Sequence, residues 1–194
     1  MTALQDLLAT FRATAKTERE KGNYFERLVK VYLLNEPLYR DMFGGKVYLW
    51  EEWRKHWMSL GNADPQSDAG IDLVAVEDVA DNPRIFAIQA KFYAEDAKIK
   101  KSDGIDSFLS ASGKAPFTNS MLFMTSYEAS HHVIEAVQGR DKPVNIIDLI
   151  TLENSKIDWA EYAQKEKVTF KESKQVRDYQ RKAIANVTVG LQHA

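Results

Sequence analysis

Three polar side chains in a mostly apolar stretch have the types and the spacing to carry out chemistry. Asp72 lies two residues after Gly70, at the start of one apolar run, while Gln89 and Lys91 stand two residues apart in the next. Because side chains alternate along a strand with a period of two, Gln89 and Lys91 must point to the same face. An amide and an ammonium are costly to bury without partners, so their presence on such a strand indicates a function.

The stretch that holds these residues predicts two strands joined by a turn. Residues 71–76 form the first strand, and residues 78–83, with the sequence DVADNP, have the residue types of a turn. The face of the second strand opposite to Gln89 and Lys91 is apolar, and its residues are Phe86, Ile88, Ala90 and Phe92. If the two strands pair, Asp72 can lie beside Gln89 and Lys91.

An Asp near one strand end, followed on the next strand by a Gln-x-Lys sequence, resembles the core of the PD-(D/E)XK nucleases. Asp72-Ile with Gln89-Ala90-Lys91 is similar to the Mrr-like branch, in which Gln commonly stands where other members carry Glu. The resemblance implies an α/β fold of the restriction-endonuclease type, with a mixed central sheet flanked by helices. It also implies an endodeoxyribonuclease that hydrolyses phosphodiester bonds in double-stranded DNA with Mg²⁺.

The same resemblance implies a role for each residue. Asp72, Gln89 and the backbone carbonyl of Ala90 would hold Mg²⁺, since hard cations take oxygen ligands, and Lys91 would stabilise the attacking hydroxide and the charge on the phosphate. Gln in place of Glu removes one negative charge, which weakens metal binding. A catalytically inactive module that binds DNA or mediates assembly is therefore an alternative, as is an unrelated α/β assembly domain in which these side chains do not converge.

A helix ahead of the sheet offers a fourth catalytic residue. Apolar positions at helical spacing predict this helix over residues 23–34, and they are Phe25, Leu28, Val29, Tyr32 and Leu33. Glu26, at the margin of this apolar face, matches the Glu that approaches the metal in nucleases of this resemblance. The alternative is a solvated carboxylate that pairs with Lys30 four residues later.

The remaining segments predict an α/β order. Thr125 and Ser126, with Glu128 completing a capping box, predict a helix that begins there and ends at Gly139. With buried strands on either side, this helix forms a parallel crossover. The periodicity predicts these strands over residues 121–124 and 144–152, and further helices over 3–16, 103–110 and 155–165. Residues 46–57 predict an aromatic-rich helix or a strand that turns into one.

Two groups of basic side chains are weaker candidates. Lys98, Lys100 and Lys101 follow the strand that carries Lys91, and they could bind DNA phosphates, although a solvated charged face is the simpler interpretation. His131 and His132 could contact a phosphate or assist proton transfer, but surface histidines without a partner motif are commoner.

Composition limits the class of protein. The chain has 194 residues, 44% of them hydrophobic, with no cysteine, which excludes disulfides, thiolate metal sites and Cys nucleophiles. No apolar run of membrane-spanning length and no signal peptide is present, so we expect a soluble, cytoplasmic protein. A net charge of −2 is unusual for a protein that binds DNA by itself, because phosphate neutralisation dominates such affinity.

The C-terminal segment suggests how the domain reaches DNA. Residues 177–184 resemble the Tyr-Gln segment that opens the motor domain of superfamily 2 helicases. We therefore expect a nuclease domain over residues 1–165, with its core at about 20–152, and a charged linker with the start of a truncated motor over 166–194. This order resembles type ISP restriction-modification enzymes, which implies helicase, methyltransferase and specificity modules in a parent chain, ATP used only by the motor, and a second nuclease copy during cleavage. The alternative is a terminal helix that docks on the domain.

Overall fold

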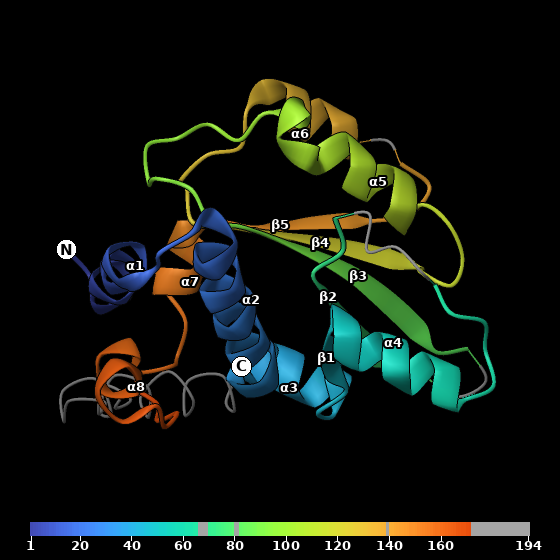
Figure 1. Cartoon of the computed structure of the whole chain (residues 1–194), viewed down its shortest axis with the longest axis horizontal. Helices are drawn as coiled ribbons and strands as arrows, with labels where there is room; N and C mark the ends of the chain where they lie inside the picture. The colour runs from blue at the N-terminus through green and yellow to red at the C-terminus, as the bar shows by residue number, and fades with distance from the viewer. Residues whose placement is uncertain (66–69, 80–81, 139, 172–194) are drawn as a thin grey trace, which may run out of the picture.

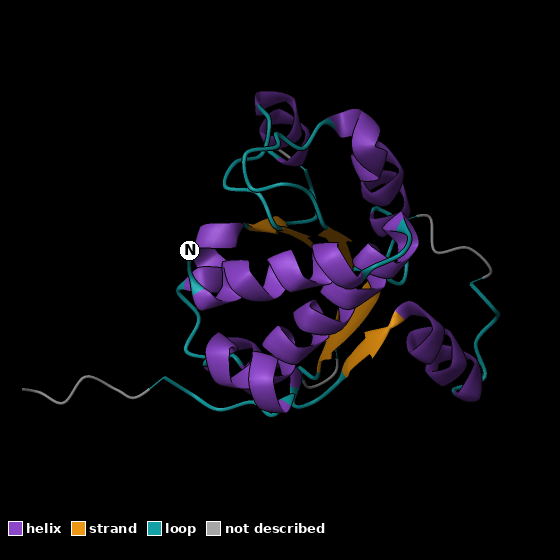
Figure 2. Ribbon diagram, turned by 60° about the vertical axis from the view of Figure 1, so that its left-hand side comes forward, coloured by secondary structure: helices purple, strands orange, loops and turns teal. Residues whose placement is uncertain are grey.

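A five-stranded mixed sheet organises the chain in the computed structural model, which describes residues 1–65, 70–79, 82–138 and 140–171. The strands lie in the order β1-β2-β3-β4-β5, antiparallel from β1 to β3 and parallel from β3 to β5 (Figure 1). The strands are β1 (Val47–Leu49), β2 (Leu73–Glu77), β3 (Arg84–Lys91), β4 (Asn119–Met124) and β5 (Val144–Ile147). This sheet has helices on both sides, as Figure 2 shows, and the predicted α/β fold class is confirmed.

The described residues also form eight helices and one short irregular helical turn, η1. In chain order they are α1 (Ala3–Thr14), α2 (Glu18–Asn35), α3 (Pro37–Phe43), α4 (Trp50–Ser59), η1 (Lys101–Ile105), α5 (Asp106–Ser112), α6 (His131–Val137), α7 (Leu149–Glu153) and α8 (Trp159–Lys165). None of the helices within the described ranges has the length and apolar character that a membrane span requires.

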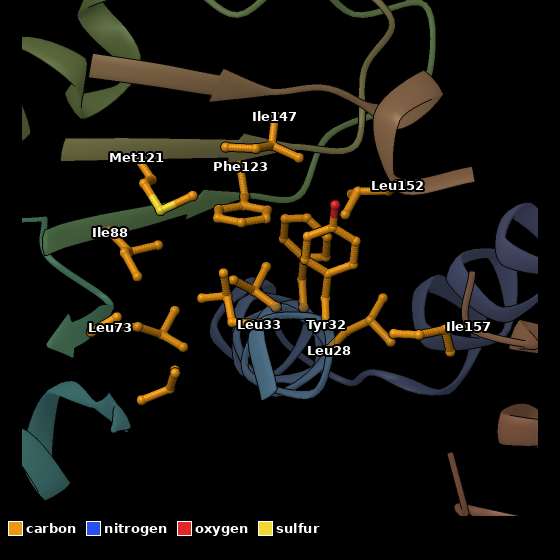
Figure 3. Close-up of a cluster of buried hydrophobic side chains, with 14 of the residues drawn as sticks. Leu28, Tyr32, Leu33, Leu73, Ile88, Met121, Phe123, Ile147, Leu152 and Ile157 are labelled. Atoms are coloured by element: carbon orange, nitrogen blue, oxygen red, sulfur yellow. The ribbon is translucent and has the colours of Figure 1, made fainter. Parts of the chain in front are cut away.

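Both faces of the central strands are buried, because each face packs against a different group of helices. Leu73, Ile88 and Phe123 point toward α2 and form one core with its side chains (Figure 3). Val74 and Ala87 point to the other face, in a core that includes residues of α4, α5 and α6. This two-sided burial explains the apolar runs from Ile85 to Ile88 in β3 and from Met121 to Met124 in β4, and it leaves Gln89 as a buried polar residue of β3.

Helix α2 begins earlier than the periodicity predicts. Its N-cap is Thr17, whose side-chain oxygen accepts a hydrogen bond from the Glu20 N–H at 3.1 Å. Gly22, which the predicted range of 23–34 leaves outside the helix, lies inside it, and the predicted start was wrong. The five predicted apolar positions of this helix are all buried. The additional residues at the N-terminus of the helix, Glu18 to Gly22, are mostly polar.

The helix after β4 does not begin at Thr125. It begins at His131 with Ser130 as N-cap, so the predicted capping box was wrong. The Thr125 hydroxyl instead accepts a hydrogen bond from the Tyr93 N–H at 2.8 Å and donates one to the Tyr93 carbonyl at 2.7 Å. These bonds join the chain after β3 to the chain after β4, so the Thr125 hydroxyl cannot serve as a cap.

The predicted strand over residues 144–152 is shorter than expected. β5 ends at Ile147, and Asp148 caps α7 by accepting a hydrogen bond from the Thr151 N–H at 2.8 Å. The apolar residues of the second half are thus helical, and Leu149 and Leu152 are buried in the core that α2 shares. The aromatic segment over 46–57 is a short strand that turns into helix α4.

The segment after α8 is part of the domain as far as Lys171. The Asp158 N–H donates to the Thr169 carbonyl and the Lys171 N–H donates to the Lys156 carbonyl, both at 2.8 Å. Residues 166–171, expected as the start of a linker, therefore pack against the loop before α8. The predicted motor segment at residues 177–184, Gly139 and part of the polar loop before Asp72 lie outside the described residues.

We expect the buried Thr125 hydroxyl to stabilise the fold, because Thr125→Val leaves the Tyr93 N–H without this acceptor. The free energy of unfolding should fall by about 1 to 3 kcal/mol in Thr125→Val, measured by urea denaturation. Thr125→Ser keeps the hydroxyl and loses only a methyl group, about 0.8 kcal/mol. Equal losses in the two variants would show that the hydrogen bonds contribute nothing.

Candidate active site

Asp72 is attached to strand β3 at two points. The paired residues of β2 and β3 end with Leu73 opposite Ile88. Beyond this pair, the Asp72 N–H donates to the Ile88 carbonyl at 2.8 Å, and the Asp72 Oδ2 accepts a hydrogen bond from the Ala90 N–H at 2.7 Å. The side-chain carboxylate thus takes the place of the next backbone acceptor of the ladder. This arrangement holds Asp72 beside the segment from Ile88 to Ala90.

The Ala90 carbonyl faces the same side as Asp72. The N–H and C=O of one strand residue point to the same edge, as the exchange of both bonds in antiparallel pairs shows. Because the Ala90 N–H is directed to Asp72, the Ala90 carbonyl oxygen is directed to this side as well. It lies past the last pair of the β2–β3 ladder, Leu73 with Ile88.

Gln89 carries a buried oxygen without a hydrogen bond. Its side chain is 1% exposed, and its Oε1 accepts no hydrogen bond from the described residues. An unsatisfied buried acceptor costs about 1 to 3 kcal/mol, and such groups are uncommon enough to require an explanation. An amide oxygen of this kind is suited to bind a hard cation.

Lys91 is half-buried near two carboxylates. Burial lowers its pKa below the ordinary value of 10.5, while the negative charges of Asp72 and Asp103 act in the opposite direction. The Asp103 Oδ2 is held by the Lys100 N–H at 2.8 Å. The structure therefore brings Asp72, Gln89 and Lys91 together, as the predicted strand pairing requires.

Two glycines with a left-handed backbone conformation lie near the ends of the Gln89 and Lys91 side chains. Gly70 has a φ of +85°, and a Cβ on it would lie 2.8 Å from the Gln89 Nε2. Gly104, in η1, has a φ of +87°, and a Cβ there would lie 3.2 Å from the Lys91 Nζ. Only glycine adopts such angles without strain. At both positions a larger residue would also crowd the neighbouring side chain.

A pocket of about 550 Å³ opens next to Asp72. Its walls come from α2, the start of α4 and the segment before β2, and they contain three carboxylates, Glu26, Glu51 and Asp72. Glu26 thus faces the same space as Asp72, while Lys30, its suggested partner, binds the Glu52 carboxylate at 2.5 Å. Glu51 was not found from the sequence, because no motif spacing links it to Asp72.

The three lysines after β3 do not line this pocket. The Lys98 Nζ lies 3.6 Å from Glu128, and the Lys101 Nζ lies 3.3 Å from Asp106. Lys100 is exposed. These contacts favour a solvated charged face over a phosphate-binding group.

The two histidines also lie apart from the pocket lining. His131 and His132 are on α6, and both Nδ1 atoms lie near the Glu135 Oε2, at 3.2 and 3.4 Å. Among the described residues, this is the one group of three His, Asp or Glu ligand atoms within 4.8 Å of one another. All three side chains are exposed.

Comparisons with known proteins find similarity to restriction endonucleases. A family model described as a restriction endonuclease, Mrr_cat_2, matches residues 34–169. Among solved structures, the ATP-dependent type ISP restriction-modification enzyme LlaBIII, bound to DNA, is similar over 100% of this chain, with 30% identity and a TM-score of 0.69. The match covers 11% of the LlaBIII chain. A search of curated proteins found no match.

Two further restriction endonucleases are similar over 78% of this chain. The DNA modification-dependent enzyme AspBHI has 15% identity and a TM-score of 0.49, and the match covers 34% of its chain. The MspJI endonuclease, in complex with a 27-mer oligonucleotide, has 12% identity and a TM-score of 0.46, and the match covers 30% of its chain.

Gly70→Ala should disturb the Gln89 side chain, because the new Cβ would overlap the Nε2 atom. Gly61→Ala is a matched control, since Gly61 has the same φ of +85° but a Cβ there meets no atom within 4 Å. Both variants carry the backbone strain, of order 1 kcal/mol. We expect Gly70→Ala to lower the free energy of unfolding further and to shift the Gln89 side-chain amide signals in NMR spectra. Identical behaviour of the two variants would mean that Gly70 does not constrain Gln89.

Proposed function

The chain belongs to the restriction endonuclease family, and from this premise we propose that it is a Mg²⁺-dependent DNA endonuclease domain without base recognition of its own. The sequence resemblance to Mrr-like nucleases and to type ISP enzymes is confirmed, and family membership indicates an enzyme that cuts DNA. One observation carries the mechanistic proposal: Asp72 binds the backbone on both sides of Gln89, whose Oε1 is buried without a hydrogen bond, and its charge acts on the Lys91 ammonium.

The oxygen donors of the site fit a divalent cation. We assign the metal-binding role to the Asp72 carboxylate, the Gln89 Oε1 and the Ala90 carbonyl, because the Gln89 oxygen is buried without a hydrogen bond and the other two lie on the same side. A bound Mg²⁺ supplies a Lewis acid for the phosphate and makes a water molecule acidic enough to attack it. The neutral Gln89 leaves more of the affinity to Asp72.

The other residues act on the substrate and on its charge. The Lys91 ammonium offsets the negative charge that builds on the phosphate during attack, an effect that is large in a site shielded from water. The charge of Asp103 favours this ammonium, and Gly104 leaves room for it where a Cβ would lie only 3.2 Å from the Nζ. Glu26 lines the same pocket as Asp72 from α2, where its carboxylate would accept a hydrogen bond from the attacking water.

Delivery to DNA by a motor is the second part of the proposal. The similarity to a type ISP enzyme extends over the whole of this chain, and a net charge of −2 gives the domain little affinity of its own. We infer a parent polypeptide with a helicase-type motor that uses ATP, together with methyltransferase and specificity modules. Two nuclease copies would meet to cut both strands of double-stranded DNA.

A catalytically inactive module that binds DNA or mediates assembly is the second candidate. Gln89 in the position of an acidic ligand favours it, since an amide contributes no negative charge to the metal site. The two candidates differ in one measurable property. Calorimetric titration with Mg²⁺ gives a binding signal that Asp72→Ala removes if the site is active, and no signal if the site has decayed.

Asp72→Ala should lower Mg²⁺-dependent cleavage of supercoiled plasmid by about 100-fold or more, because it removes the carboxylate that we assign to the metal site. Cleavage is measured with the parent enzyme and ATP. Asp78→Ala is the matched control, because Asp78 is exposed on the same hairpin and its carboxylate forms an ion pair with Lys46. Unchanged cleavage by Asp72→Ala would remove Asp72 from the mechanism.

Lys91→Met should abolish cleavage without weakening the fold. The pKa of Lys91 lies below its ordinary value, so at neutral pH the protonated side chain is less stable in the folded chain than in the unfolded one. This penalty is present below the folded pKa and disappears as the pH rises toward 10.5. The free energy of unfolding at pH 7 should therefore stay constant or rise in Lys91→Met, measured by urea denaturation. A large fall would indicate a structural role.

A further inference from the structure

The arginines of the described part of the chain divide into two groups. Five have a bonding partner, and these are Arg12, Arg40, Arg54, Arg84 and Arg140. The other two, Arg19 and Arg27, are exposed and make neither an ion pair nor a hydrogen bond with the described residues. Both line the pocket that contains Asp72 and Glu26.

These two arginines lie on one stripe of α2. Arg19, Asn23 and Arg27 are spaced by four residues, which advances a helix by about 6 Å with little rotation, so the stripe is roughly 12 Å long. All three line the pocket, together with Glu26 on the same helix. The opposite side of α2 is buried in the core. The helix is thus fixed on one side and presents two guanidinium groups to the pocket on the other.

The charges in the pocket explain why cations are needed there. Glu26, Glu51 and Asp72 place three carboxylates in the walls, and these repel the phosphates of a DNA strand. A guanidinium group binds a phosphate through two parallel hydrogen bonds and is more weakly hydrated than an ammonium. Arginines already paired with carboxylates would have to break those contacts first, whereas Arg19 and Arg27 have no such pairing within the part of the chain that the structure describes.

We propose that Arg19 and Arg27 bind two backbone phosphates of one DNA strand, on either side of the phosphate that is cut, with Asn23 between them. The inference rests on the proposed endonuclease function and adds the surface that sets the position of the strand. Phosphate contacts fix the position of a protein on DNA but carry no sequence information. α2 therefore aligns the strand with Asp72 whatever its sequence.

The test is the salt dependence of DNA binding in the absence of divalent metal. Fluorescence anisotropy with a labelled duplex compares the unmodified chain with Arg19→Gln/Arg27→Gln. Arg40→Gln/Lys156→Gln is the control, because it removes the same two charges from exposed positions outside the pocket lining. Arg19 and Arg27 are exposed, so thermal unfolding should be unchanged in both double variants.

We expect the Arg19→Gln/Arg27→Gln variant to bind about tenfold more weakly or worse near 0.1 M salt, with a slope of log K against log salt that is smaller by about 2. The control variant should keep most of the slope. Equal effects of the two double variants, or no measurable binding by the unmodified chain, would overturn the proposal. If the arginine pair supports binding but the parent enzyme with Mg²⁺ and ATP cuts no DNA, the endonuclease proposal fails while the phosphate contacts stand.

Discussion

The double attachment of Asp72 to strand β3 is the constraint on which the rest of the site depends. Its backbone N–H binds the Ile88 carbonyl, and its carboxylate binds the Ala90 N–H. Gln89 lies between these two points, so its backbone is held in a fixed position relative to Asp72. The antiparallel pairing of β2 and β3 thus converts two positions 17 residues apart in the sequence into neighbours.

The polar site stands in a strand that is otherwise built for burial. β3 is covered on both faces and lies between β2 and β4, so the unpartnered Gln89 oxygen and the lowered pKa of Lys91 both reflect polar groups held away from water. Each lowers the stability of the fold when no substrate or metal is present. The large apolar cores on the two faces allow the fold to tolerate these local penalties.

Much of this structure followed from local patterns in the sequence. Alternation with a period of two predicted the faces of β3, and helical spacing predicted the buried positions of α2. The misses arose where a side chain has a partner distant in the sequence. Thr125 has the residue type of a cap but binds Tyr93, and Glu51 reaches the pocket only because α4 starts beside Asp72, where the Trp50 N–H donates to the Asp72 carbonyl.

The pairing of residues 166–171 with the loop before α8 has a mechanical consequence. A pull on the backbone beyond Lys171 would act first on the Lys171 hydrogen bond to Lys156 and the Thr169 bond to Asp158. The load would then pass to α8, which packs on α1. Neither of these helices is next to β3 in the sequence. Tension from any polypeptide attached on this side would be resisted at the edge of the domain, before it could alter the spacing between Asp72 and Lys91.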